Sequence, residues 1–244
     1  MKGLTDINRS LLNDYAPVYL PASRTGFLLT RRDIVNKAAR KMFSLASTED
    51  VFQEKLTAPY IQVLEMINNL KDSSDMHTEE KIPLINFMQN EIIHGDVNVS
   101  SDGKIIHYSH EDNTRKELPL SITSSVVTET ASLLLLLNNY HPLRLIVIKE
   151  PETHLHPALQ KKIAQLLIRF VHSGAPIWMT THSETILQHF NNMIKLNNQT
   201  FEDRSELLEK FGYTNNDLIN PEEINLYQFD QSEKYTIIKK LETH

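Results

Sequence analysis

The segment from residue 145 to residue 181 constrains the fold most, because it combines two strand patterns with one helix pattern between them. Residues 145–148 (LIVI) are continuously apolar, as strands are when both faces of a parallel sheet are covered. Apolar residues recur at helical spacing over 157–172, after Pro157 at a first helical position and before Gly174. The run 176–181 (PIWMTT) follows directly. This crossover predicts two parallel strands and an α/β fold.

Shorter patterns predict the elements around this unit. They are a strand between Pro17 and Pro21, a β-hairpin over 95–109 with Asp102-Gly103 as its turn, a buried helix over 125–139, a strand over 194–196, a helix over 201–212 and a hairpin of strands 224–230 and 235–242. Trp178 and the leucines at 133–137 are expected in the core. We divide the chain into residues 1–29 (strand and turn of the core), 30–93 (a helical lobe) and 94–244 (the rest of the core).

Composition limits the classes of protein to consider. An apolar content of 40% is enough for a proper core. The longest apolar run is far shorter than the roughly 20 residues of a membrane span, and the first residues form no signal peptide, so we expect a cytoplasmic protein without membrane contact. With no cysteine, a metal would need His, Asp or Glu ligands, and the net charge of -6 argues against a surface coated with phosphate-binding lysines.

Ionisable residues follow both strands of the predicted crossover. Lys149 and Glu150 end the first strand, and Thr180 leads into His182 at the end of the second. Ligands of open parallel sheets bind at the carboxyl ends of the strands, so we expect the Glu150 carboxylate and the His182 imidazole to share one ligand. The carboxylate can accept a proton from water, and the imidazole can donate a hydrogen bond to a phosphate oxygen.

Three stretches carry a family resemblance. SITSSVVTETASLLLLL, LIVIKEPETHLHP and WMTTHSETIL, in that order, resemble the signature helix, the Walker B strand with its loop, and the switch histidine of ABC-type ATPases. The chain is most similar to the AAA family subgroup of overcoming-lysogenisation-defect, RecF and structural-maintenance-of-chromosomes ATPases, and YLPASRTGF resembles a segment common in that subgroup. The resemblance covers residues 17–29 and 94–230. It implies a P-loop NTPase-like parallel sheet flanked by helices, with a helical insertion and small β-hairpins.

The same resemblance implies roles for individual residues. Glu150 would be the catalytic carboxylate that activates water, and His182 the switch that contacts the γ-phosphate. Ser124 and Ser125 would touch the nucleotide of the opposite protomer. The implied ligands are ATP and Mg²⁺, and the implied assembly is a homodimer.

Further positions follow from the resemblance with less direct roles. His154 and His156 would lie in the loop that crosses the two-fold interface. Ser23 and Arg24 would face the nucleotide. Lys149 departs from the family pattern, and it is the charge of its ammonium group that would suit a position near a phosphate.

Two departures from the family pattern affect catalysis. Lys149 stands where the family has an aspartate that holds magnesium through water, and a cation there opposes the metal. No GxxxxGK[ST] motif occurs among the six glycines. We therefore expect that the N-terminal Walker A lobe is missing, supplied by a partner chain or replaced by self-association, because the strand 176–181 (PIWMTT) would otherwise present a bare apolar edge. The isolated chain is expected to bind ATP weakly and to hydrolyse it negligibly.

Several functions remain open at this point. The first is an ATPase domain acting in a DNA-linked or anti-phage defence system, and the second is a non-hydrolysing regulatory or interaction module derived from an ATPase. The third is a metal-dependent hydrolase using His154, His156 and His182, although no third carboxylate at a known spacing accompanies them. Glu150 and Glu152 could also be carboxylates that merely favour the start of the next helix. A basic cluster could contact nucleic acid or form a solvated helix face: Arg31, Arg32, Lys37, Arg40 and Lys41.

Overall fold

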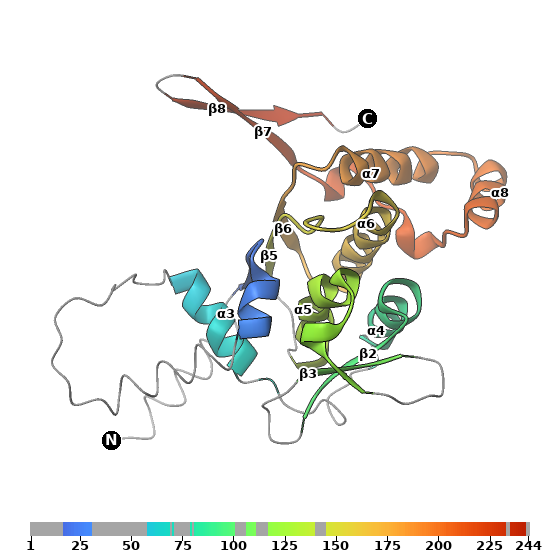
Figure 1. The fold of residues 1–244 in the computed structure, drawn as a ribbon. Helices are drawn as coiled ribbons and strands as arrows, with labels where there is room; N and C mark the ends of the chain where they lie inside the picture. Colours follow the sequence, from blue (N-terminus) through green and yellow to red (C-terminus); the bar gives the residue numbers. More distant parts are fainter. Residues whose placement is uncertain are drawn as a thin grey trace, which may run out of the picture.

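A three-stranded parallel sheet forms the centre of the protein (Figure 1). The computed structural model describes residues 17–30, 58–68, 70, 79, 81–100, 106–110, 117–139, 145–232 and 235–242. The strands are β1 (Val18–Leu20), β5 (Ile146–Lys149) and β6 (Ile177–Thr180), in the order β1-β5-β6. Both neighbouring pairs are parallel, with Ile148 opposite Leu20 on one side and Met179 on the other. The parallel crossover predicted from the sequence is confirmed.

Two helices cover one face of this sheet. They are α5 (Ser125–Asn139) and α6 (Pro157–His172), both within the predicted ranges. The leucines at 133–137 are at most 3% exposed, because α5 is enclosed nearly all round, as its continuous apolar pattern predicted. Ile148 from the sheet and Phe170 from α6 join the same buried cluster. This packing fixes where the β5 and β6 strand ends lie relative to α5.

The opposite face of the sheet is covered differently at its two ends. The helix α3 (Ala58–Asn68) packs on β1, where the rings of Tyr19 and Tyr60 meet edge to face at 6.2 Å. At the other end, Trp178 of β6 is 68% exposed. The expectation that Trp178 lies in the core is wrong, because side chains alternate along a strand and only Ile177 and Met179 pack on the buried cluster.

Short elements connect the helical segment to α5. The helix α4 (Ile82–Met88) continues into the π-helix η1 (Gln89–Ile93), which ends at His94 with a positive φ of 53°. The strands β2 (Gly95–Val99), β3 (Ile106–His110) and β4 (Leu118–Pro119) then form an antiparallel sheet, and the turn η2 (Leu120–Ile122) precedes α5. The predicted hairpin over 95–109 is confirmed. Its turn residues and the basic cluster at 31–41 lie outside the described residues.

The C-terminal part follows β6 with two helices and a hairpin. They are α7 (Glu184–Asn197), α8 (Phe201–Phe211), the turns η3 (Asn215–Asp217) and η4 (Pro221–Glu223), and the strands β7 (Leu226–Gln231) and β8 (Thr236–Leu241). The predicted strand over 194–196 is wrong, since Ile194 is a buried residue of α7. The antiparallel β7–β8 hairpin was predicted and extends away from the helices (Figure 1). Within the described part of the chain, no helix has the length and apolar character to cross a bilayer.

Candidate functional site

The loop after β5 is built on an unusual backbone. Glu150 and His154 both have positive φ angles, of 49° and 61°. Residues other than glycine rarely adopt this conformation, and it costs on the order of 1 kcal/mol or more at each position. The Thr153 hydroxyl and backbone N–H both donate to the Glu150 carbonyl, at 2.9 and 3.2 Å, which closes the turn. These two hydrogen bonds therefore hold the loop in a tight turn.

Glu152 joins the ends of β5 and β6. Its Oε1 accepts hydrogen bonds from the Thr181 hydroxyl and from the backbone N–H of His182, both at 2.8 Å. In addition, the Glu150 N–H donates to the Thr180 carbonyl at 2.9 Å, which extends the pairing of the two strands by one residue. The structure thus brings the ends that carry Glu150 and His182 together. The sequence had singled out Glu152 only as a possible helix-leading carboxylate.

The end of β6 is fixed further by Ser183. Its hydroxyl donates to the side-chain oxygen of Gln160 at 2.6 Å and accepts from the backbone N–H of Ile186 at 3.2 Å, which caps α7. The Gln160 amide in turn donates to the Leu155 carbonyl at 2.8 Å. A continuous set of hydrogen bonds therefore connects the β5 loop, the start of α6 and the start of α7. His182 lies in this set with an exposed side chain.

Arg24 lies beneath the loop and holds it from inside. Its guanidinium is 1% exposed and donates to the carbonyls of Lys149, Glu150 and Pro151 at 3.3 to 3.4 Å. Burial lowers the pKa of Arg24, and the charge of Glu129, 3.9 Å away, acts in the opposite direction. These contacts show a structural role for Arg24. Its burial disfavours the predicted contact with a nucleotide, whereas Ser23 is exposed.

Glu129 is a second support that the sequence analysis missed. This residue of α5 is 5% exposed, yet its carboxylate accepts from the Thr25 hydroxyl at 2.7 Å and contacts His154 Nδ1 at 2.8 Å. The arrangement anchors His154, whose side chain is otherwise exposed at the loop. A glutamate inside the apolar pattern VVTETASLLLLL was the available signal, because a buried carboxylate requires partners.

His156 and Ser124 cap the N-termini of helices in this structure, and Ser125 is the first residue of α5. His156 Nδ1 accepts from the backbone N–H of Ala158 at 3.4 Å at the beginning of α6. The Ser124 hydroxyl accepts from the N–H of Val127 at 3.4 Å, so Ser124 rather than Ser125 caps α5. Ser124 also lines an apolar hollow of about 540 Å³ between η1, β3, α5 and α6. Contacts of these residues with a nucleotide or across an interface stay predictions.

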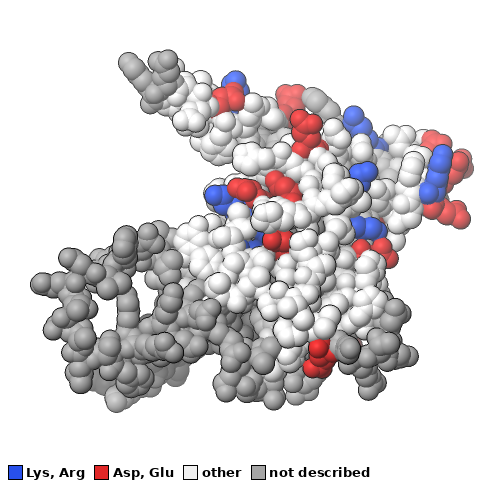
Figure 2. Space-filling view, in the orientation of Figure 1, with Lys and Arg blue, Asp and Glu red and all other residues white. Residues whose placement is uncertain are grey.

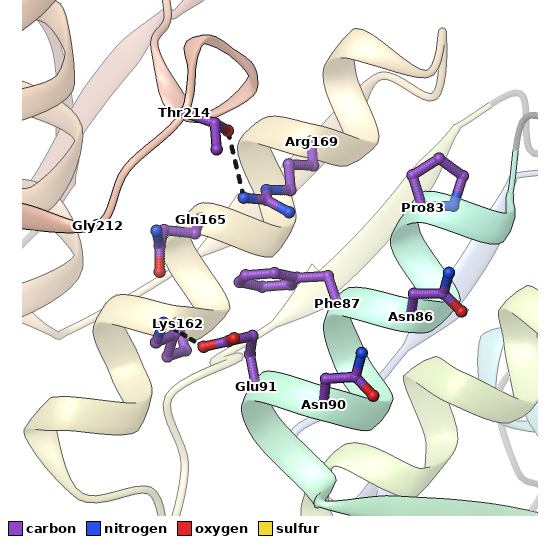
Figure 3. A pocket seen from close by; sticks show the side chains of 10 residues that line it. All are labelled: Pro83, Asn86, Phe87, Asn90, Glu91, Lys162, Gln165, Arg169, Gly212 and Thr214. Carbon is purple, nitrogen blue, oxygen red and sulfur yellow. Dashed lines mark hydrogen bonds and ion pairs between the residues drawn. The ribbon is translucent and has the colours of Figure 1, made fainter. Parts of the chain in front are cut away.

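A second hollow lies between α4 and α6 (Figure 3). Its volume is about 310 Å³, and the Phe87 ring points across it towards α6. The charges here are internally balanced, since Lys162 pairs with Glu91 at 2.8 Å and Arg169 pairs with Asp217 at 2.7 Å. Both cations that line this hollow are therefore already paired with carboxylates.

Charged groups on the face shown in Figure 2 are mixed rather than segregated. Acidic and basic groups lie side by side near the ends of β5 and β6, and the described surface in this view carries no broad basic area. Lys149 and Glu150 are one such pair, with Nζ and Oε1 4.0 Å apart. Among the described residues, no group of three or more His, Asp or Glu side chains is placed to hold a metal ion. The metal-hydrolase alternative thus gains no support from this geometry.

Comparison with known proteins identifies the protein family to which the chain belongs. The sequence matches the AAA ATPase domain over residues 27–187, which is more than half of its length. The chain therefore belongs to the AAA ATPase domain family, a class of nucleotide-binding, ATPase-type domains. The matched range contains α5, the β5 loop, α6, β6 and His182.

Two further comparisons complete this result. No curated protein matches the chain. A solved structure described as "Structural biochemistry of ATP-driven dimerization and DNA stimulated activation of SMC ATPases" is similar with a TM-score of 0.42 and 7% sequence identity. The alignment covers 75% of this chain and 88% of that chain.

Proposed function

We propose that this protein binds ATP at the joined ends of β5 and β6. The observation that carries the proposal is that Glu152 Oε1 accepts hydrogen bonds from both the Thr181 hydroxyl and the His182 backbone N–H. These bonds hold the strand end that carries Glu150 next to the strand end that carries His182. Glu150 would accept a proton from an attacking water, and His182 would donate a hydrogen bond to the terminal phosphate. Arg24 and Glu129 would act indirectly by keeping the loop in shape.

A partner is proposed to complete the site. In the described sheet, β6 pairs on one side only, and its exposed Trp178 adds apolar surface near that edge. The sequence has no phosphate-binding GxxxxGK[ST] loop. We propose that another chain supplies this loop, or that a second copy of this chain covers the β6 edge in its place. Ser124, Ser125, His154 and His156 would then lie towards the partner, as the family resemblance implies.

The ion pair of Lys149 with Glu150 favours a second form of this function. The Lys149 ammonium lies 4.0 Å from Glu150 Oε1, at the position where the family pattern has the aspartate that holds magnesium, so the isolated chain would bind ATP without appreciable hydrolysis. In that form the protein is a regulatory or interaction module derived from an ATPase. A setting in DNA-linked or anti-phage defence follows only from the resemblance to the subgroup and is part of the proposal.

Equilibrium binding of fluorescently labelled ATP to the purified chain tests the proposed site. We expect weak, saturable binding that His182→Ala weakens and that Glu150→Gln leaves intact or improves, since the latter change removes a negative charge. Phosphate release should stay at background in both the wild type and Glu150→Gln. Binding that His182→Ala and Lys149→Met leave unchanged would place the nucleotide elsewhere. Ordinary turnover of pure protein, abolished by Glu150→Gln, would reject the non-hydrolysing form.

A further inference from the structure

Lys149 has a well-defined position at the end of β5. It pairs with Thr180 across the sheet, and its backbone carbonyl accepts a hydrogen bond from Arg24 at 3.4 Å. The side chain is half exposed, and its ammonium group lies 4.0 Å from Glu150 Oε1. A fixed backbone and an accessible ammonium group thus occur together at the edge where the proposed nucleotide site lies.

The magnesium ion that the AAA ATPase family implies does not fit the groups at this edge. Magnesium requires oxygen ligands in octahedral geometry, usually from one or two carboxylates together with phosphates and water. Here Glu150 is paired with Lys149, and Glu152 Oε1 already accepts two hydrogen bonds. Glu152 Oε2 is buried and makes no hydrogen bond within the described residues, so it is not turned to solvent. The ammonium group would also repel a divalent cation from Glu150.

We propose that the Lys149 ammonium takes the place of the divalent cation, so that a triphosphate binds here without a metal ion. This inference rests on the proposed nucleotide site. A lysine is a compact, mobile point charge that forms strong charge-assisted hydrogen bonds with phosphate oxygens. When the ligand binds, the ammonium group exchanges its weak contact with Glu150 for a contact with phosphate. Lys149 therefore supplies positive charge where the family otherwise uses a metal.

The test compares ATP affinity in excess EDTA and in magnesium chloride. The wild type should bind equally well in both, within about twofold, and Lys149→Met should bind about tenfold more weakly or worse in both. Lys149→Asp should bind poorly in EDTA and regain affinity when magnesium is added. Lys162→Met is the matched control, because Lys162 also pairs with a glutamate, Glu91, but in the hollow of Figure 3. It should behave like the wild type.

A metal-binding measurement separates this inference from the proposed function. Manganese binding without nucleotide, followed by electron paramagnetic resonance, should be at least about tenfold tighter in Lys149→Asp than in the wild type. Wild-type ATP binding that is lost in EDTA, or equal manganese binding by both proteins, would overturn the inference. If neither buffer supports ATP binding, the proposed function fails, and the manganese comparison alone decides whether Lys149 excludes a divalent ion. Circular dichroism confirms that each variant is folded.

Discussion

Arg24 donates a hydrogen bond of 3.3 Å to the backbone carbonyl of Glu150, although the two residues are 126 positions apart in the sequence. The contact is one of five that the buried guanidinium makes with main-chain carbonyls. Because the same group faces Glu129, a single side chain ties the segment after β1, the helix α5 and the β5 loop together. The conformation of the candidate site thus depends on a residue that cannot itself reach the surface.

Replacing Arg24 should be severely destabilising. Arg24→Met leaves Glu129 buried without its cation and several carbonyls without donors, so we expect a loss of about 3 to 5 kcal/mol in the free energy of unfolding. Urea denaturation measures this change. Arg204→Met is the control, since that partly exposed arginine of α8 contacts mainly Asn197, and should cost less than about 1 kcal/mol. Equal losses for the two variants would contradict the assigned role of Arg24.

Glu152 should be needed for the geometry of the site more than for its charge. Glu152→Ala removes the acceptor shared by Thr181 and His182, so we expect weaker ATP binding and a stability loss of about 1 to 3 kcal/mol. Glu152→Gln retains an acceptor oxygen and should keep most of both properties. Nucleotide titration and urea denaturation of the two variants provide the comparison. If Glu152→Ala binds ATP as the wild type does, the hydrogen bonds that connect the two strand ends are not required for ATP binding.

His189 should make the protein sensitive to acid. It is 3% exposed, its Nε2 has no hydrogen-bond partner among the described residues, and its ring meets Tyr213 edge to face. Burial lowers the pKa of His189 to about 4, which the charge of Asp217 opposes and those of Lys161 and Lys162 reinforce. The unfolded chain, with a histidine pKa near 6.5, binds the proton more readily.

The protein should lose stability as the pH falls. Because the folded-state pKa is the lower one, stability is complete above about pH 6.5 and declines as the pH falls towards 4, by on the order of 3 kcal/mol. Thermal unfolding between pH 4 and 7.5 measures the slope. His189→Phe should flatten it, while His172→Phe, at an exposed position, should not. An unchanged slope in His189→Phe would show that other groups determine the acid sensitivity.

Trp178 is the only tryptophan in the sequence and therefore reports on the β6 edge. In the isolated chain its fluorescence should be typical of a solvated indole and readily quenched by acrylamide, since the residue is 68% exposed. Docking of the proposed partner should shift the emission to shorter wavelength and protect the indole from acrylamide. Emission and quenching across a dilution series distinguish these states. A buried indole at every dilution would mean that the edge is already covered at the lowest concentration.

The sequence predicted the elements that have a strong local pattern. The crossover from β5 through α6 to β6, the helix α5 and both hairpins follow from periodicity, caps and turn residues. The short run around Ile194 resembled a strand, but α7 begins at the Ser183 cap and continues through it. That cap was the signal which would have prevented the error.

The candidate site was less predictable because its supports are long-range contacts. Glu150 and His182 were identifiable as strand ends, but the contacts of Arg24 and Glu129 join residues 105 positions apart. Trp178 was misjudged for a related reason. An apolar strand has the same pattern whether or not a helix covers both of its faces, so the apolar run alone cannot show that the Trp178 face of β6 is exposed.

At Glu150, the left-handed backbone favours glycine, whereas the proposed function requires a carboxylate. With φ at 49°, glycine is the residue that this turn accommodates with least strain, yet the chain carries an acid there. Selection for folding alone would favour Glu150→Gly, whereas selection for the proposed role of Glu150 as a proton acceptor would oppose it. A library of variants screened only for heat resistance should therefore drift towards glycine at this position and lose the carboxylate as it does so.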